Sequence, residues 1–162
     1  MKGNITGWLN ELAFVPCDLA PEAMVDEWSG DIGCGVKYFS QDAVIKLAPA
    51  AGIELDPALS PAEKLKVVQG KMEQGDAGAR AIYETIGVYL AIRWRSTPCS
   101  MSQHVLLMGR VTSGEGGDLV LAKAQEVLRT EYPQLKMQVN LPDEKSRRVG
   151  QSVAAASLPQ IG

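Results

Sequence analysis

The feature that most constrains the fold is the succession of segments in the second half of the chain. The short apolar run His104–Met108 is typical of a buried strand, and Leu135–Leu141 alternates like a second strand. Between them, Asp118 leads an amphipathic segment that is predicted to be a helix. A strand, a helix and a strand in this order form a right-handed crossover between parallel strands. The sequence therefore predicts an α/β fold.

Three further helices are predicted before this crossover, over Ser40–Ala51, Ser60–Gly75 and Asp76–Leu90. The second has the strongest start signal, because Ser60 and Glu63 form the Ser-x-x-Glu pattern of a capping box with proline at the first helical position. Two short strands are too few to cover the apolar faces of so many helices. Either the fold is mostly helical, or strands of the same sheet are missing from the chain.

Residues 1–40 are predicted to be irregular. At most one short strand is expected, around Glu11–Val15, and Gly30, Gly33 and Gly35 lie too close together for a regular element. A small-residue helix is expected over Gly150–Leu158. The chain is thus expected to form a single domain over residues 1–162, with an irregular region over 1–40 and a helical and strand–loop–helix core over 41–162.

Composition and charge exclude several classes of protein. The 16 Lys and Arg residues against 19 Asp and Glu give a net charge of −3, so no broad basic surface for nucleic acid is expected. No apolar run approaches the roughly 20 residues that span a bilayer, and the first residues do not open a signal peptide. The three cysteines provide no disulfide framework, which favours a reducing compartment. We therefore expect a cytoplasmic protein that binds neither membranes nor nucleic acid.

The glycine-rich segment Gly109–Gly117 is the candidate site. A glycine-rich turn between a buried strand and a helix N-terminus exposes backbone N–H groups, and the helix dipole favours an anion there. The alternative is a tight connection whose glycines only relieve backbone strain. No Gly-Lys-Ser/Thr follows, so the segment is not a Walker A loop, and no dinucleotide fingerprint is present. The candidate nucleotide-binding residues are Gly109, Thr112, Ser113, Gly114, Gly116 and Gly117.

Three motifs of the chain resemble the ROK family, which contains glucokinase-like sugar kinases and related repressors of the actin/hexokinase/Hsp70 ATPase superfamily. Met108–Asp118 is similar to the adenosine-side loop of that family. Glu27–Ser40 keeps both glycines, the last cysteine, the tyrosine and the serine of its Cys-x-Cys-Gly-x-x-Gly-Cys-x-x-x-Tyr-x-Ser motif. Asn10–Phe14 stands where the family has Gly-Glu-x-Gly-His. The resemblance implies the C-terminal lobe of an actin-like (ribonuclease H-like) ATPase that lacks its first strands.

This resemblance implies a function and also limits it. It implies the adenosine-side lobe of a kinase that uses Mg-ATP to phosphorylate a sugar, with Glu11 as a sugar ligand; the alternative for Glu11 is a solvated loop carboxylate. The family's phosphate loop, magnesium site and catalytic aspartate have no counterpart in these residues, so no catalytic residue is assigned. We expect a lobe that is inactive alone and either self-associates or acts with a missing N-terminal lobe. The alternative is a non-catalytic binding or regulatory domain on the same fold.

The departures from the family pattern concern metal and sugar. The family's four zinc ligands correspond here to Phe14, Glu27, Ser29 and Cys34. Only one soft ligand remains, so neither zinc nor another metal site is expected. Val36 replaces a second sugar-binding glutamate of the family, which leaves the sugar undefined.

Two other segments have open interpretations. His104 is the only histidine, and it is interpreted as the first residue of a strand rather than a catalytic base, because no Ser/Asp partner pattern accompanies it. Ile92–Ser100 breaks the apolar pattern of the preceding helix. Permissible codons for Ala91–Gln103, read from the third base, yield an apolar string, so we hypothesise a compensated local frameshift that the coding DNA would test. The alternative is an exposed loop with a basic tip.

Overall fold

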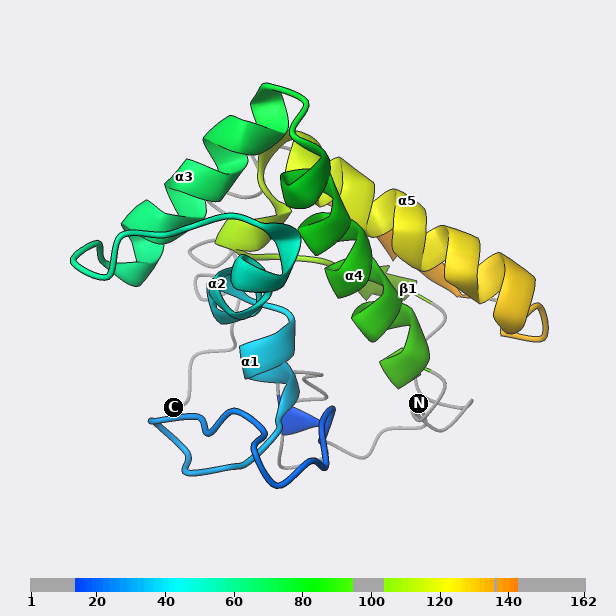
Figure 1. Cartoon of the computed structure of the whole chain (residues 1–162). Helices are drawn as coiled ribbons and strands as arrows, with labels where there is room; N and C mark the ends of the chain where they lie inside the picture. The colour runs from blue at the N-terminus through cyan, green and yellow to red at the C-terminus, as the bar shows by residue number, and fades with distance from the viewer. Residues whose placement is uncertain (1–13, 95–103, 136, 143–162) are drawn as a thin grey trace, which may run out of the picture.

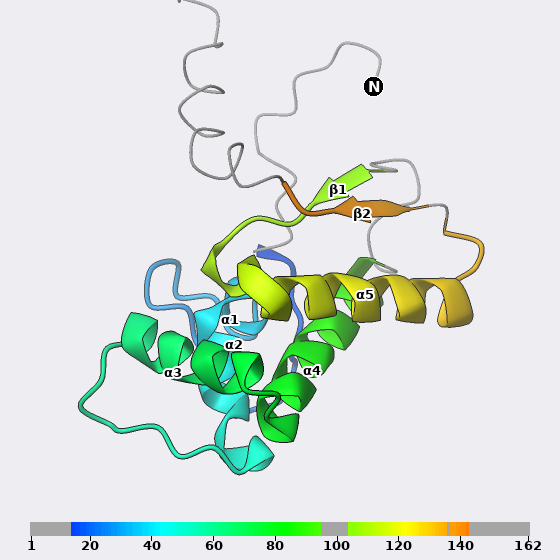
Figure 2. The same cartoon turned by 90° about the horizontal axis from the view of Figure 1, so that it is seen from above.

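The computed structural model describes residues 14–94, 104–135 and 137–142, and the structural statements below refer to these residues. Two long helices dominate it, α4 and α5, which pack against each other (Figure 1). Figure 2 shows α5 between a two-stranded sheet and the remaining helices. The predicted helix-rich α/β arrangement with a small sheet is therefore confirmed. The elements are α1 (Gly35–Tyr38), α2 (Gln41–Leu47), the 3-10 helix η2 (Pro49–Ala51), α3 (Pro61–Glu73), α4 (Ala77–Trp94), β1 (His104–Leu106), the 3-10 helix η3 (Arg110–Thr112), α5 (Gly114–Glu131) and β2 (Gln138–Asn140).

The two strands pair in parallel, as the sequence predicts. Val105 lies opposite Val139, and α5 connects the strands. Val139 is buried, while Gln138 and Asn140 are exposed, so one side of β2 is apolar and the other polar. The amide Nε2 of Gln125 on α5 donates to the carbonyl of Val139 at 3.0 Å. Each strand has three residues, fewer than the apolar and alternating runs of the sequence suggest.

Side-chain caps begin α2, α3 and α4 at the predicted places. The Ser60 hydroxyl and the Glu63 carboxylate form the predicted capping box at α3. The Asp76 carboxylate accepts from the amide of Ala79 at 2.8 Å and so caps α4. At α2, the Ser40 hydroxyl accepts from the amide of Asp42. These signals are local, which is why the sequence predicts them.

The predicted extent of the first helix is wrong in one respect. The segment Ser40–Ala51 is not a single helix, because α2 ends at Leu47 and Pro49 starts the short 3-10 helix η2. Proline has no backbone N–H for an α-helical hydrogen bond, so the geometry changes at this residue. Gly52 adopts a left-handed φ of 73° and ends the segment, as predicted.

The core lies between α2, α3, α4 and α5. The inward faces predicted for the second and third helices are confirmed. Gly87 on α4 allows α5 to approach closely, since a Cβ there would lie 2.7 Å from the carbonyl oxygen of Val120 and 2.9 Å from Cβ of Lys123. The predicted inward residues that are buried are Leu65, Val68 and Met72 of α3, and Ala79, Ile82, Ile86 and Leu90 of α4.

The segment from Phe14 to Cys34 is less irregular than predicted. Two antiparallel bridges, Pro16 with Cys34 and Val25 with Ile32, fold it back on itself, and α1 follows directly at Gly35. Gly33 has a φ of 68° and fits closely against the backbone of Asp18. The glycines that suggested irregularity therefore permit a tight turn. Of the strand expected at Glu11–Val15, the described residues 14 and 15 are not in a strand.

Several predictions lie outside the described residues. These are the role of Glu11, the helix at Gly150–Leu158 and residues 95–103 of the frameshift hypothesis. Helix α4 continues to Trp94, beyond the predicted end at Leu90. Within residues 14–94, 104–135 and 137–142, no helix is both long enough and apolar enough to cross a membrane.

Candidate functional site

The candidate segment lies between β1 and the first turn of α5, but its helix starts earlier than predicted. The sequence places the helix start at Asp118, whereas α5 begins at Gly114 with Ser113 as its N-cap residue. Consequently Gly114, Gly116 and Gly117 belong to the helix and not to the loop before it. The prediction failed because a run of glycines is typical of a loop, and only packing shows why they are helical here.

Two of these glycines are required by close packing. A Cβ on Gly116 would lie 2.6 Å from Cε1 and from Cζ of the buried Tyr83 ring. A Cβ on Gly117 would collide with the carbonyl oxygen of Thr112. Both glycines are buried, so they do not line an open loop. For Gly116 and Gly117, close packing therefore accounts for the glycines without a ligand, as the alternative of a tight connection predicts.

Thr112 also supports the turn and does not face outward. It is 4% exposed, and its hydroxyl Oγ1 donates to the carbonyl of Gly109 at 2.8 Å. Its backbone amide donates to the same carbonyl at 3.2 Å. Thr112 therefore braces the 3-10 helix η3, and its hydroxyl is already engaged.

The other three candidate residues are exposed. Ser113 makes no side-chain capping bond, although it stands at the N-cap of α5 with extended backbone angles (φ −90°, ψ 143°). Gly109 and Gly114 have φ values of 129° and 64°, and no atom outside the neighbouring residues and the backbone of α5 lies within 4 Å of the place where a Cβ would be. The first amides of a helix have no partner within the helix. At α5 these donors are therefore not occupied by a side-chain cap, and the positive end of the helix dipole lies beside them.

Two charged residues flank this helix start. Arg110 is exposed, and its carbonyl accepts from Nε2 of Gln69 at 3.3 Å, which ties η3 to α3. Glu115 is exposed in the first turn of α5. A guanidinium attracts an anionic group, whereas a carboxylate repels one and can accept hydrogen bonds from hydroxyls. The start of α5 therefore has one side chain of each sign beside it in the sequence.

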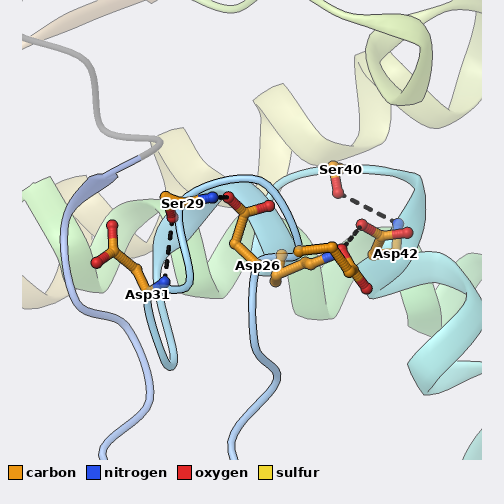
Figure 3. Close-up of polar contacts among 7 residues, drawn as sticks. Asp26, Ser29, Asp31, Ser40 and Asp42 are labelled. Atoms are coloured by element: carbon orange, nitrogen blue, oxygen red, sulfur yellow. Dashed lines mark hydrogen bonds and ion pairs between the residues drawn. The ribbon is translucent and has the colours of Figure 1, made fainter.

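The four positions that correspond to zinc ligands in the ROK family have other partners here. The Phe14 ring lies 6.5 Å from that of Trp28, and Cys34 is buried. Figure 3 shows Ser29 between Asp26 and Asp31, where its hydroxyl accepts from the amide of Asp31 at 3.1 Å. The described residues contain no group of three or more His, Cys, Asp or Glu side chains placed to hold a metal ion.

Glu27, the fourth of these positions, belongs to an ion-pair network that the sequence analysis missed. It pairs with Lys37, which is 7% exposed and also contacts Asp42 at 3.0 Å. Hydrogen bonds to Glu27 and then to Asp42 raise the pKa of Lys37. Next to this network, the hydroxyl of Tyr38 donates a hydrogen bond to the carboxylate of Asp18 at 2.5 Å. These contacts hold the segment before α1 onto α1 and α2. The sequence signal that could have revealed this network is that Lys37 is the first basic residue after residues 3–36, in which every charged residue is acidic.

A cavity of about 430 Å³ lies elsewhere, between the second half of α5 and β2. Its lining includes Gln125, Leu128 and Arg129 of α5, together with Met137 and Val139. Gln125 and the later helix residues of this lining lie three or more turns beyond Gly114, where α5 begins. The cavity contributes nothing to the site at the start of α5.

The sequence was compared with models of protein families, with curated proteins and with solved structures, and no match was found in any of them.

Proposed function

We propose that this chain is the adenosine-side lobe of an ATP-dependent sugar kinase that resembles the ROK family, with nucleotide bound at the start of α5. The observation that carries the proposal is the exposed helix start after a parallel strand, at which Ser113 makes no side-chain cap. Backbone amides at such a place bind phosphate groups well. The helix-rich α/β arrangement with parallel strands joined through α5 is compatible with a partial actin-like lobe.

The described residues divide the work of nucleotide binding. The Ser113 hydroxyl and the free amides at Gly114 and Glu115 are donors for a phosphate oxygen, and Arg110 supplies a positive charge nearby. The Glu115 carboxylate suits a ribose hydroxyl and disfavours a complete triphosphate at the same point. This division favours the adenosine end of ATP here. When bound, Mg-ATP would supply the phosphoryl group, and no described residue is assigned to the magnesium ion.

The remaining parts of the proposal concern groups outside this site. Glu11, which lies outside the described residues, is proposed as the sugar ligand. A phosphate loop and a catalytic base would come from an N-terminal lobe, and this chain alone is proposed to bind nucleotide without turning it over. Positioning and charge neutralisation dominate phosphoryl transfer, so half of a cleft contributes little rate. We place the protein in the cytoplasm, as a homo-oligomer or joined to that lobe.

Calorimetric titration of ATP into the chain and into a Ser113→Asp variant tests this function. Aspartate is as good an N-cap as serine, so the variant should fold with equal or slightly higher stability. Its carboxylate would occupy the free amides and repel phosphate, so ATP affinity should fall at least tenfold, while adenosine affinity falls less. The matched control is Ser40→Asp, which makes the same change at the already capped start of α2 and should leave ATP binding unchanged.

Two outcomes would contradict the proposal. The unmodified chain could fail to bind both ATP and adenosine, or Ser113→Asp could bind ATP as tightly as the unmodified chain. In either case the second candidate, a non-catalytic binding or regulatory domain on the same fold, would become the better description. The observation that favours this candidate is that two of the four zinc-ligand positions have other contacts, Phe14 with the ring of Trp28 and Glu27 with Lys37.

A further inference from the structure

Exposed apolar side chains gather in one short part of the molecule. Eight large apolar side chains of the described residues are exposed, and five of them belong to the segment 14–32. The other three are scattered over α3, α4 and the residue pair after β1. Single exposed apolar residues are normal, but a cluster on one segment is typical of an interaction site. The five are Phe14, Leu19, Val25, Trp28 and Ile32.

The turn between Val25 and Ile32 arranges four of these side chains together. Val25 and Ile32 lie opposite each other in an antiparallel bridge, so their side chains point to the same side. Trp28 lies in the turn between them and is 84% exposed. Its ring contacts that of Phe14, with the two planes tilted by 43°. We call Val25–Ile32 together with Phe14 the apolar hairpin; it lies in the blue loops below α1 in Figure 1.

Hydrogen bonds hold the apolar hairpin in one conformation. The amide of Asp26 donates to the carbonyl of Asp31, and that of Gly30 to the carbonyl of Asp26, both at 2.8 Å. The Asp26 carboxylate accepts from the amide of Ser29 at 2.9 Å (Figure 3). This bond is the main cause of a lowered pKa for Asp26. A surface that is already ordered loses less entropy on binding, so its contacts contribute more to affinity.

The charge of the segment that forms the apolar hairpin is mainly acidic, although Lys37 pairs with Glu27 and Lys46 lies 3.7 Å from Asp18. Residues 14–36 contain five acidic residues and no Lys, Arg or His. Glu22 and Asp31 are exposed, and neither carboxylate has a partner within the part of the chain that the structure describes. Glu27 remains 83% exposed in spite of its ion pair with Lys37. A second copy that docked through the same face would bring these carboxylates together, whereas a cationic partner would complement them.

We propose that the apolar hairpin is a docking surface for a polypeptide segment that carries Lys or Arg beside an aromatic or aliphatic anchor. Trp28 contributes most of the affinity, because large exposed aromatic side chains on a rigid frame are typical centres of binding energy. The carboxylates of Glu22 and Asp31 select the cationic partner and speed its association. This surface is independent of the nucleotide site, so either proposal can fail without the other.

The test uses fluorescein-labelled ten-residue peptides and fluorescence anisotropy with the full chain. One set alternates Lys with Trp, Phe or Leu, and matched sets replace every Lys by Glu or by Gln. The Lys set should bind most tightly and should weaken as salt rises. Trp28→Ala should weaken binding at least tenfold, and Asp31→Lys about threefold or more. Both side chains are exposed, so folding is retained; Met108→Ala, an exposed apolar residue elsewhere, is the control and should have no effect.

Three results would overturn this proposal. The Glu peptides could bind as well as the Lys peptides, Trp28→Ala could bind them normally, or none of the Lys peptides could bind the unmodified chain. Sedimentation velocity tests whether a second copy of the chain occupies the surface instead. If the chain dimerises and Trp28→Ala makes it monomeric, the surface is an interface between two copies and the proposed partner is wrong.

Discussion

The helices α3 and α5 both start after a serine, but only the serine before α3 caps its helix with its side chain. Each helix follows a serine in extended conformation, Ser60 and Ser113. At α3 the third helical residue is Glu63, whose carboxylate accepts from the amide of Ser60 at 2.8 Å. At α5 the third helical residue is Gly116, which cannot return such a bond and which the Tyr83 ring requires to be small. The comparison teaches that α3 uses its first amides for stability, whereas α5 leaves them free.

The largest difference between the two helices should appear in the free energy of unfolding when one glycine in each helix is replaced by alanine. Gly117→Ala in α5 would press a Cβ into the carbonyl of Thr112, so we expect the free energy of unfolding to fall by about 3 kcal/mol. In Gly70→Ala of α3 the new Cβ meets no atom of another element within 4 Å, so this substitution should raise the free energy of unfolding by about 0.5–1 kcal/mol. Urea unfolding of both variants measures the difference. Equal effects of the two substitutions would show that the start of α5 is not closely packed.

The second largest difference should be between alanine substitutions of Ser60 and Ser113, measured as the loss of free energy of unfolding. Ser60→Ala removes the capping box and should lower the free energy of unfolding by about 1 kcal/mol. Ser113→Ala removes no capping bond, so its effect should stay within about 0.5 kcal/mol. Thermal unfolding of the two single variants checks this, with the double variant as a test of additivity. A loss at Ser113 as large as that at Ser60 would mean that its hydroxyl caps α5 in solution.

The smallest effect should appear in the pH dependence. Hydrogen bonds from Ser60, chiefly that of its side chain, lower the pKa of Glu63. The stabilisation is therefore present above the ordinary glutamate pKa and is lost as pH falls through the lower value in the folded chain. The stability advantage of the unmodified chain over Glu63→Gln should be larger at pH 6 than at pH 3. Urea midpoints at the two pH values measure it, and an advantage independent of pH would exclude an ionised carboxylate from the cap.

Local signals explain most of what the sequence predicted correctly. A cap such as Asp76, a stop such as Gly52 and an apolar spacing such as Leu65, Val68 and Met72 each act within one or two helical turns. The parallel pairing of β1 and β2 was also predicted, because parallel strands need a long crossover connection and a helix stands between these two strands in the sequence. These predictions needed no contact between distant residues.

The candidate site was predicted only in part. Its location after β1 was correct, and Gly109, Ser113 and Gly114 are exposed there. Thr112 and the pair Gly116 and Gly117 instead pack inward. A glycine needed by a ligand and a glycine needed by a neighbouring ring are the same letter in a sequence. Whether ATP binds at this site stays a prediction.

By itself the sequence determined where α2, α3 and α4 begin, which faces of α3 and α4 are buried, and that two strands run parallel. Only the tertiary structure decided that α5 starts at Gly114, since Tyr83 and Thr112 approach it from other elements. It also decided that Lys37 is buried between Glu27 and Asp42. The physical reason is range: hydrogen-bonded caps and helical periodicity act over a few residues, whereas packing and ion pairing depend on which distant segments the fold brings together.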